Sequence, residues 1–255
     1  MTQNKDNIQI HKNERIDILY PSHYKIIQST EVFSYSMDAV LLGHFARVPK
    51  SYKSTILDLC SGNGAVTMAI SKQTNAPVIG IEIQERLANM AERSATLNHL
   101  TDKITYLNMN LLDYQSQFKP GTVDMITCNP PYFKSDKDRQ NPNQALALAR
   151  HEISLTMEHL LMAISQLLKK NGTAYLVYNT ERFIELINEC KKHQLTPKRI
   201  QMVYPKPGRV SKFFLIELIK EGSPLGFKME EPLYIMEADG RYSTEMSTIL
   251  YEPAN

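Results

Sequence analysis

The stretch Thr55-Ile-Leu-Asp-Leu-Cys-Ser-Gly-Asn-Gly-Ala65 decides the fold that we predict for this chain. Its first part, Thr55–Cys60, is a short apolar run typical of a buried β-strand, and a helical pattern begins at Ala65. The turn between them, Ser61–Gly64, contains glycines that let the backbone reverse without a Cβ clash and approach a ligand closely. A strand, a tight turn and a helix in this order indicate the first unit of a parallel sheet.

Four more apolar runs repeat this strand signal further along the chain. They lack the alternation of a half-exposed strand, so we interpret them as strands buried on both faces. They cover residues Pro77–Ile83, Lys103–Asn108, Val123–Cys128 and Thr173–Tyr178. Helical patterns lie between them, the clearest at Leu87–Leu97, at Ile153–Leu168 with a basic last turn at Lys169–Lys170, and at Phe183–Cys190. This alternation predicts helices on both faces of the sheet, because right-handed crossovers place them there.

The last two predicted strands, Lys198–Tyr204 and Phe213–Ile219, are joined differently. The segment between them, 205–212, is too short for a helical crossover, so we expect these two strands to be antiparallel. The predicted fold class is therefore α/β, with a mostly parallel seven-stranded sheet, helices on both faces and an antiparallel last hairpin.

The chain extends beyond this core, which we place at residues 54–221, in both directions. Residues 1–53 contain the pattern of a hairpin around Ile16–Ile27 and of a helix from about Ser36 to Val48. No convincing linker separates the parts of the chain, so a single domain is expected over residues 1–255.

The carboxyl-terminal extension, residues 222–255, suggests a second hairpin. Its strands are expected at Pro232–Met236 and Arg241–Leu250, on either side of a turn at Asp239-Gly240.

Composition places the chain among ordinary globular proteins. Hydrophobic residues make up 42% and charged residues 22%, a balance that can fill a core. The net charge of +2 neither requires nor excludes a nucleic-acid partner, so such a prediction must rest on local features.

Localisation is predicted from what the sequence lacks. The polar start, MTQNKDNIQIHKNERID, has no apolar stretch of a secretory signal, and no window approaches the ~18 apolar residues of a membrane helix. Cys60, Cys128 and Cys190 are odd in number and far apart, which suits the reduced cytosol and not a zinc site. We therefore expect a cytoplasmic protein with neither a membrane segment nor a metal site.

Three polar residues, Asp58, Glu82 and Asn110, lie at or just after the ends of the first three predicted strands and indicate a cofactor site. Glu82 ends the second strand, where a carboxylate can accept hydrogen bonds from both hydroxyls of a ribose. The turn after Asp58 lacks the complete G-x-G-x-x-G of dinucleotide enzymes, and its shorter form suits a cofactor without a pyrophosphate. The alternative is two tight turns and an acidic helix start at Glu82–Glu85. Asn110, after the third strand, suits an adenine contact or a turn cap.

The fourth strand ends in the most informative stretch of the chain, Thr127-Cys-Asn-Pro-Pro-Tyr-Phe133. Two prolines cannot continue a parallel strand because they donate no hydrogen bonds, and they hold the backbone stiffly. The side chain of Asn129 and the carbonyl of Pro130 can then point at one spot, where an exocyclic NH2 group would present two donors. By itself the same stretch would be interpreted as a rigid turn beside an aromatic side chain.

This arrangement suits methylation of a planar nitrogen. The lone pair of an amino-purine or amide nitrogen is delocalised, so the nitrogen is a poor nucleophile. Two fixed acceptors favour the pyramidal geometry in which the lone pair faces the methyl group of a sulfonium donor. Tyr132 or Phe133 would stack on the planar acceptor, and such stacking contributes ~1–3 kcal/mol per base. A base buried in a stem or loop would have to turn out to reach the site.

Two motifs together resemble those of the Rossmann-like S-adenosylmethionine-dependent amino-methyltransferases. They are Asp58–Gly64 and Asn129–Tyr132. The resemblance implies that S-adenosylmethionine is the cofactor and that Asn129, Pro130, Pro131 and Tyr132 hold the acceptor.

Two further segments are similar to one subfamily, the valine-tRNA adenine N6-methyltransferases, which modify an adenine in the anticodon loop. Its amino-terminal signature resembles Lys25-Ile-Ile-Gln28 followed by Phe33-Ser-Tyr-Ser-Met-Asp-Ala-Val-Leu-Leu42. The carboxyl-terminal segment of its Gram-positive-type relatives is similar to Pro232-Leu-Tyr-Ile235 with Asp239-Gly-Arg-Tyr242. This resemblance implies N6-methylation of adenine in a tRNA, with the oligomeric state left open.

The resemblance also implies which residues contact the cofactor. Asp58 and the glycine turn would line its methionine part, Glu82 its ribose, and Ile83 with Asn110 its adenine. The stretch Phe33–Asp38 would close over it, with Asp38 near its amino group. The complete predicted set is Asp38, Asp58, Ser61, Gly62, Asn63, Gly64, Glu82, Ile83, Asn110 and Leu111.

Two groups of cations are candidates for contacts with RNA phosphates. The first follows the acceptor motif, together with Phe133, and consists of Lys134, Lys137, Arg139 and Arg150. The second lies in the segment 205–212, without an acid among its members, and consists of Lys206, Arg209 and Lys212. Either group is also compatible with a solvated surface.

Three other functions remain open from the sequence alone. A guanine N2-methyltransferase acting on rRNA and a protein glutamine N5-methyltransferase use similar Asn-Pro-Pro motifs on planar nitrogens. A catalytically inert RNA-binding protein is the non-enzymatic alternative, although it would have no need of Gly62, Gly64, Glu82 and Asn129 together.

Overall fold

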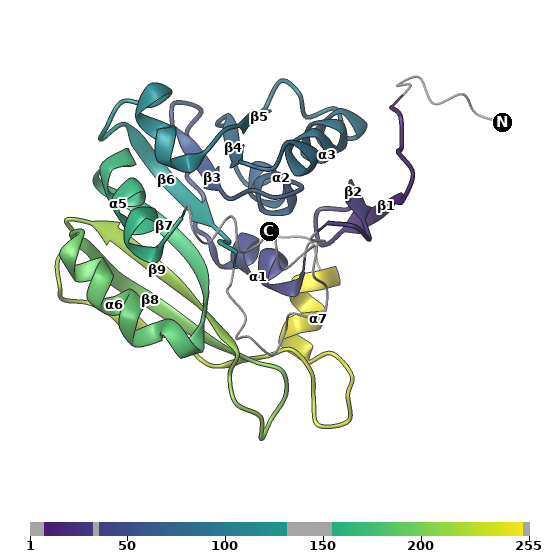
Figure 1. Cartoon of the computed structure of the whole chain (residues 1–255). Coiled ribbons are helices and arrows are strands. Elements are labelled where there is room, and N and C mark those ends of the chain that lie inside the picture. Colours follow the sequence, from purple (N-terminus) through teal and green to yellow (C-terminus); the bar gives the residue numbers. More distant parts are fainter. Residues whose placement is uncertain (1–7, 33–35, 132–154, 252–255) are drawn as a thin grey trace.

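The computed structural model describes residues 8–32, 36–131 and 155–251. At its centre lies a sheet of nine strands in the order β10-β8-β9-β7-β6-β3-β4-β5, in which β11 also pairs with β8 (Figure 1). The strands are β3 (Ile56–Leu59), β4 (Val78–Glu82), β5 (Ile104–Asn108), β6 (Val123–Cys128), β7 (Leu168–Asn179), β8 (Leu195–Tyr204), β9 (Phe213–Lys220), β10 (Lys228–Met229) and β11 (Leu233–Tyr234).

The sheet has the predicted pattern of strand directions. The pairs β5–β4, β4–β3, β3–β6 and β6–β7 are parallel, whereas β9 is antiparallel to both β7 and β8. The seven predicted strands correspond to β3–β9, and the α/β fold class is confirmed. Two short strands, β10 and β11, also pair with β8 and account for the difference between seven and nine. The sequence analysis missed β10, whereas β11 lies within the strand expected at Pro232–Met236 and joins the large sheet instead of only a terminal hairpin.

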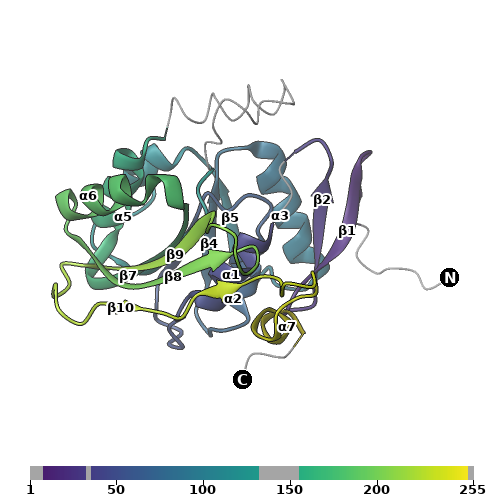
Figure 2. The same ribbon diagram turned by 90° about the horizontal axis from the view of Figure 1, so that it is seen from below.

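Helices cover both faces of this sheet (Figure 2). The helices are α1 (Met37–Phe45), α2 (Ala65–Ser71), α3 (Glu85–Leu97), α5 (Met157–Leu167), α6 (Phe183–Lys192) and α7 (Thr244–Tyr251), with short 3-10 helices η1 (Leu111–Ser116) and η3 (Thr180–Arg182). In Figure 2, α5 and α6 lie on one side of the strands and α1, α2 and α7 on the other.

The core consists of two apolar layers, one on each side of the sheet. Ile56 of β3 packs with residues of α1 and α2, whereas its neighbours Leu57 and Leu59 pack with residues of α5 on the opposite face. All three side chains are fully buried, which explains why this strand carries no polar alternation.

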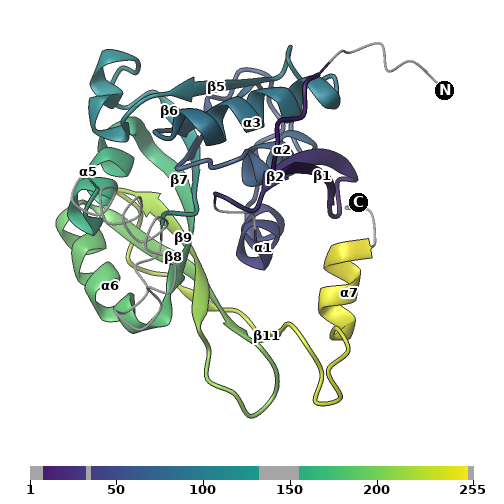
Figure 3. The ribbon, with the colours of Figure 1, turned by 45° about the vertical axis from the view of Figure 1, so that its right-hand side comes forward.

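The amino-terminal hairpin is confirmed as β1 (Glu14–Leu19) paired with β2 (Tyr24–Ser29). Its second strand packs against α3 (Figure 3), where the N–H of Ile27 donates to Ser94 Oγ at 2.9 Å. The helix predicted to reach Val48 ends at Phe45. The physical reason is Pro49, which disfavours the helical conformation for the residue before it.

The junction between α5 and β7 differs from the prediction. Lys169 and Lys170 were expected in the last turn of a helix, but α5 ends at Leu167 and β7 begins at Leu168. Lys169 forms an ion pair with Asp124 of the neighbouring strand β6. Apolar periodicity cannot locate this boundary, because a buried leucine suits either element. The predicted helix start at Ile153 lies outside the described residues.

The predicted terminal hairpin is wrong over most of its second strand. Only one antiparallel bridge, Met236 with Tyr242, joins the two segments, and a helix, α7, begins at Thr244. Ser243 caps this helix, because its Oγ accepts a hydrogen bond from the N–H of Met246 at 3.0 Å. Met246 and Leu250 are buried on one helical face, a spacing that the strand interpretation overlooked.

The strand order places the candidate site. Beginning at β3, the chain adds β4 and β5 on one side and then crosses to β6 and β7 on the other. In such sheets ligands bind at the carboxyl ends of the strands where the order reverses, here between β3 and β6.

Candidate active site

The turn after β3, which we call the glycine loop (Cys60–Gly64), depends on its glycines for its shape. Gly62 and Gly64 have φ values of 57° and 88°, a left-handed conformation that costs glycine little. A Cβ atom on Gly64 would lie 2.2 Å from the hydroxyl oxygen of Tyr106, so no larger residue fits there. A Cβ atom on Gly62 would meet nothing within 4 Å, so the loop is open at that point.

Glu82, at the end of β4, fixes the glycine loop by accepting a hydrogen bond from its backbone. One carboxylate oxygen, Oε2, accepts a hydrogen bond from the N–H of Gly62 at 2.9 Å, and Oε1 accepts one from the N–H of Gln84 at 2.8 Å. Burial raises the pKa of this carboxyl group, while these hydrogen bonds lower it. The structure thus brings together Glu82 and Gly62, two of the residues that the sequence analysis assigned to the cofactor site.

Asp58 is almost completely buried, with 1% of its surface exposed. Its two oxygens accept hydrogen bonds from Thr67 Oγ1 at 2.6 Å and from Thr127 Oγ1 at 2.7 Å. Burial raises the pKa of this carboxyl group to about 6, against the opposite effect of the two hydroxyl groups. The sequence analysis did not single out either threonine.

Ser61 and Asn63 form the rest of the loop and are both buried. The amide of Asn63 donates to the carbonyl of Ile27 in β2 at 3.1 Å, which joins the amino-terminal hairpin to the loop. Ser61 Oγ is buried but has no hydrogen-bond partner among the described residues. A buried polar atom without a partner is costly, so a bound ligand that hydrogen-bonds to Ser61 would be stabilised.

Two residues that support the glycine loop were not found from the sequence. The ring of Tyr106, on β5, occupies the space that Gly80 leaves free, where a Cβ atom would approach the ring to 2.5 Å. Asn108 donates to the carbonyls of Glu82 and Ile83, each at 3.0 Å, and so fixes the end of β4. The glycine inside a strand was the available signal, because such glycines mark a close approach by a neighbour.

The residues predicted near an adenine ring lie beyond β4 and β5. Ile83 is 39% exposed, whereas Leu111 is buried. Asn110 Oδ1 accepts a hydrogen bond from the N–H of Leu112 at 3.0 Å and caps η1. The structure therefore displays the capping role that the sequence left as an alternative for Asn110.

Asp38 lies in the first turn of α1 and is buried. Its carboxylate accepts hydrogen bonds from Ser36 Oγ and, at 3.1 Å, from the N–H of Ala39. The remaining residues of the predicted closing stretch, Phe33–Tyr35, lie outside the described residues.

The candidate acceptor residues form what we call the proline corner (Asn129–Pro131), directly after β6. Cys128 pairs with Leu59 of β3, so the proline corner and the glycine loop begin at the same level of adjacent parallel strands. Asn129 is half-buried and Pro130 is buried. Tyr132 and Phe133 lie outside the described residues.

The second group of predicted cations lies on the connection between β8 and β9, called the basic loop (205–212). Phe213, which follows the loop, pairs with Asn179 at the end of β7, so the loop lies at the same sheet edge as the proline corner. Arg209 and Lys212 are exposed and Lys206 is half-buried. The first group, Lys134, Lys137, Arg139 and Arg150, lies outside the described residues.

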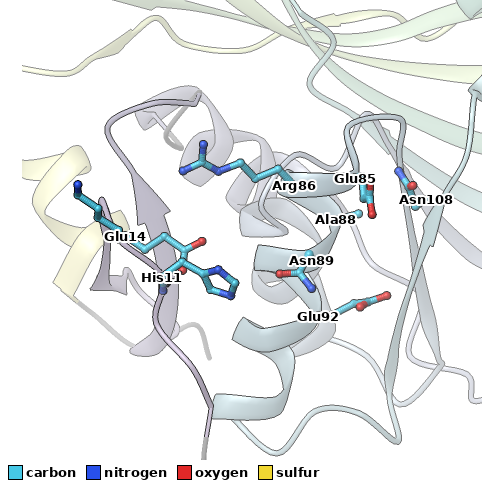
Figure 4. Close-up of a pocket in the computed structure, with 9 residues that line it drawn as sticks. His11, Glu14, Glu85, Arg86, Ala88, Asn89, Glu92 and Asn108 are labelled. Atoms are coloured by element: carbon cyan, nitrogen blue, oxygen red, sulfur yellow. Dashed lines mark hydrogen bonds between the residues drawn. The ribbon is translucent and has the colours of Figure 1, made fainter.

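An open cavity of about 780 Å³ lies beside this site, between the residues that lead into β1 and the first half of α3 (Figure 4). Most of its lining is charged or polar: His11, Lys12, Glu14, Glu85, Arg86, Ala88, Asn89, Glu92 and Asn108. None of these residues belongs to the glycine loop or to the proline corner, so the cavity is a neighbour of the predicted site and not the site itself.

Two features are absent from the ranges of the chain that the structure describes. No group of three or more His, Cys, Asp or Glu side chains there is arranged to hold a metal ion. None of the helices there is long and apolar enough to cross a membrane.

Comparison with known proteins identifies the family. A family described as methyltransferase small domain matches residues 23–190. The chain belongs to this family. The prediction of an S-adenosylmethionine-dependent methyltransferase is confirmed by this membership and by methyltransferase relatives over most of the chain.

Two relatives carry the same name, tRNA1(Val) (adenine(37)-N6)-methyltransferase. The one from Bacteroides thetaiotaomicron is 32% identical, covering 84% of this chain and 87% of the relative. The one from Shewanella sediminis is 28% identical, covering 84% and 89%. Among solved structures, a predicted O-methyltransferase from Agrobacterium tumefaciens has a TM-score of 0.66 at 20% identity, covering 84% of this chain and 95% of that one. That similarity confirms the Rossmann-like methyltransferase fold.

Proposed function

We propose that this enzyme transfers the methyl group of S-adenosylmethionine to N6 of an adenine in tRNA, and that the target is adenine 37 of a valine tRNA. The observation that carries the proposal is the position of the proline corner beside the glycine loop, in a chain whose relatives are named for this reaction. Because tRNA is modified in the cytoplasm, we expect the enzyme to work there.

The cofactor would lie over the glycine loop. Ser61 Oγ, buried without a partner among the described residues, is available to it, and the open side of Gly62 lets it approach the backbone. Glu82 would accept the ribose hydroxyls beside its bond to Gly62. Bound S-adenosylmethionine supplies an electrophilic methyl group on a positively charged sulfur. The other proposed cofactor contacts are Asp38, Asp58, Asn63, Gly64, Ile83, Asn110 and Leu111.

The proline corner would orient the acceptor. Asn129 Oδ1 and the carbonyl oxygen of Pro130 accept the two hydrogens of the adenine amino group, while Pro131 keeps the backbone stiff. With both hydrogens held, the nitrogen lone pair would turn out of conjugation toward the methyl carbon. The new N–C bond would form as the S–C bond breaks, and the extra proton on the nitrogen would then pass to solvent water. This mechanism is orientation and electrostatic stabilisation without a strong base. Tyr132 and Phe133 would stack on the base.

The cations would position the tRNA through its phosphates, which carry no sequence information. We assign this role to Lys206, Arg209 and Lys212 of the basic loop, and to the group after the acceptor motif. We also propose that the chain forms a single domain, with a core at residues 54–221 and extensions at residues 1–53 and 222–255.

The test is methyl transfer onto RNA. Purified enzyme is incubated with isotope-labelled S-adenosylmethionine and bulk tRNA from cells that lack the gene, and the nucleosides are analysed by mass spectrometry. Labelled N6-methyladenine in valine tRNA is the expected product, and the Asn129→Ala variant is the negative control. Label in N2-methylguanine or in protein would replace the proposed substrate, and absence of cofactor binding at millimolar concentration would contradict enzymatic activity altogether.

A further inference from the structure

A buried hydrogen-bond bridge connects the two halves of the candidate site. Asp58 of β3 accepts hydrogen bonds from Thr67 of α2 at 2.6 Å and from Thr127 of β6 at 2.7 Å. The exposed fraction is 1% for Asp58 and 0% for both threonines, so no bulk solvent competes for these bonds. The backbone N–H of Thr67 is a further donor to the same carboxylate.

The bridge joins elements that carry different functions. Thr67 lies in the first turn of α2, directly after the glycine loop, whereas Thr127 lies two residues before Asn129 of the proline corner. Asp58 and Thr127 are register partners in the paired strands β3 and β6, so the bond runs straight across the sheet. A shift of β6 along or away from β3 would stretch it.

The helical end of this bridge lies next to the glycine loop. Thr67 follows Gly64 by three residues, and the carbonyl oxygen of Gly64 accepts a hydrogen bond from the hydroxyl of Tyr106 at 3.4 Å. The hydrogen-bonded bridge itself runs from Thr67 through Asp58 to Thr127.

A carboxylate is an expensive group to place in this position. Burying a charge costs free energy unless hydrogen bonds compensate for the lost water, and here burial raises the pKa of Asp58. Ile56, two residues earlier on the same face of the strand, is fully buried, so an apolar side chain can fill this layer of the core without that cost. The carboxylate instead fixes the orientation of both threonine side chains, because each hydroxyl must point at one of its oxygens.

We infer that Asp58, through Thr67 and Thr127, is a positioning residue that fixes the distance and orientation of the proline corner relative to the glycine loop. This inference rests on the proposed function, because the distance matters only if a methyl group crosses from one to the other. Reacting atoms must be held about 3–3.5 Å apart and aligned, so a small shift of β6 lowers the rate of transfer.

A bond that only positions the acceptor should affect the rate of methyl transfer and not the affinity for the cofactor. When the hydroxyl of Thr127 is lost, Thr67 still holds the other oxygen of Asp58, so the glycine loop should stay intact. Thr127→Val keeps the shape of the side chain and removes the hydroxyl. We expect kcat to fall about 10- to 100-fold, while the Kd for S-adenosylmethionine stays within about twofold of the original value. Thr127→Ser, which restores the hydroxyl, should return kcat to near the original value.

The control is Ser71→Ala in α2. Ser71 is also fully buried, and its hydroxyl donates to the carbonyl of Met68 at 2.8 Å, within its own helix. It should lower the melting temperature by an amount similar to that for Thr127→Val without changing kcat. Calorimetry with S-adenosylmethionine confirms that each variant is folded, and Thr127→Ala replaces the valine variant if that one does not fold.

The inference is wrong if Thr127→Val leaves kcat unchanged, if serine does not restore it, or if cofactor affinity falls in parallel with kcat. The wild-type enzyme decides the proposed function separately. If it labels guanine or protein instead of adenine, that proposal fails, and the same variants measured on the labelled acceptor still test the bridge.

Discussion

The glycine loop and the proline corner differ in how their polar groups are held. Around the glycine loop, Glu82 and Asp58 each accept at least two hydrogen bonds from the protein and are buried. Asn129 is half-buried and follows a strand directly, and its shape comes from the two prolines after it. The glycine loop is therefore held by hydrogen bonds, whereas the proline corner is stiffened by its proline rings and is tied to β3 by the bond from Thr127 to Asp58.

This difference indicates what each half contributes. The glycine loop is held by hydrogen bonds from other parts of the protein, which suits a cofactor that must bind in one pose. The proline corner carries an amide side chain and a backbone carbonyl, both of which can accept hydrogen bonds from a substrate. Substitutions on the two sides should therefore affect different kinetic constants.

The largest effect is expected on the acceptor side. Asn129→Ala removes an acceptor that stabilises the amino group during transfer, and such losses lower kcat roughly 10²-fold or more. The Kd for S-adenosylmethionine, measured by calorimetry, should remain nearly unchanged. Asn179→Ala is the matched control, because Asn179 ends the neighbouring strand β7 and is also half-buried. Equal losses of kcat in both variants would mean that Asn129 acts only as a strand end.

A smaller effect is expected on the cofactor side. Glu82→Ala leaves the N–H of Gly62 without its partner and removes the proposed ribose contact, so the Kd for S-adenosylmethionine should rise about 10- to 100-fold. At saturating cofactor, kcat should fall much less than in Asn129→Ala. Glu85→Ala, which removes an exposed acid in the first turn of α3, should change neither constant. If Glu82→Ala lowered kcat and left the Kd unaltered, the proposed division between the two halves would have to be abandoned.

The sequence alone predicted the parts of the site that depend on local rules. The glycine loop, the acid at the end of β4 and the proline corner each follow from the backbone needs of a turn or from the order of strands. The terminal hairpin failed because the cap at Ser243 and the buried spacing of Met246 and Leu250 were outweighed by a turn signal at Asp239-Gly240.

The partners of the buried carboxylate could not be predicted from sequence. Thr67 and Thr127 are 60 positions apart along the chain and meet only because β3 and β6 are adjacent in the sheet. Register between distant strands depends on packing of the whole core, which no local pattern reports. For the same reason Tyr106 was missed, although Gly80 signalled that some neighbour approaches closely.

The smallest expected effect concerns a third region, the basic loop. It lies at the same edge of the sheet as the glycine loop and the proline corner, but in the proposed mechanism it contacts neither the cofactor nor the acceptor base. Replacing Lys206, Arg209 and Lys212 together by alanine should raise KM for tRNA about tenfold and leave kcat and cofactor affinity unchanged. Each lost phosphate contact should reduce the slope of log affinity against log salt by roughly 0.7–0.9. Filter binding over a range of salt concentrations measures this slope.

The control uses the opposite edge of the sheet. Lys50 and Lys53 precede β3 and Lys119 precedes β6, so these exposed cations lie at the amino ends of the parallel strands. The triple alanine variant of this set changes the net charge by the same amount. If RNA binding responds only to net charge, both triple variants will lose the same salt slope. If the basic loop faces the tRNA, only the variant of Lys206, Arg209 and Lys212 will lose salt slope, because screening limits the effect of a surface charge to about 8–10 Å.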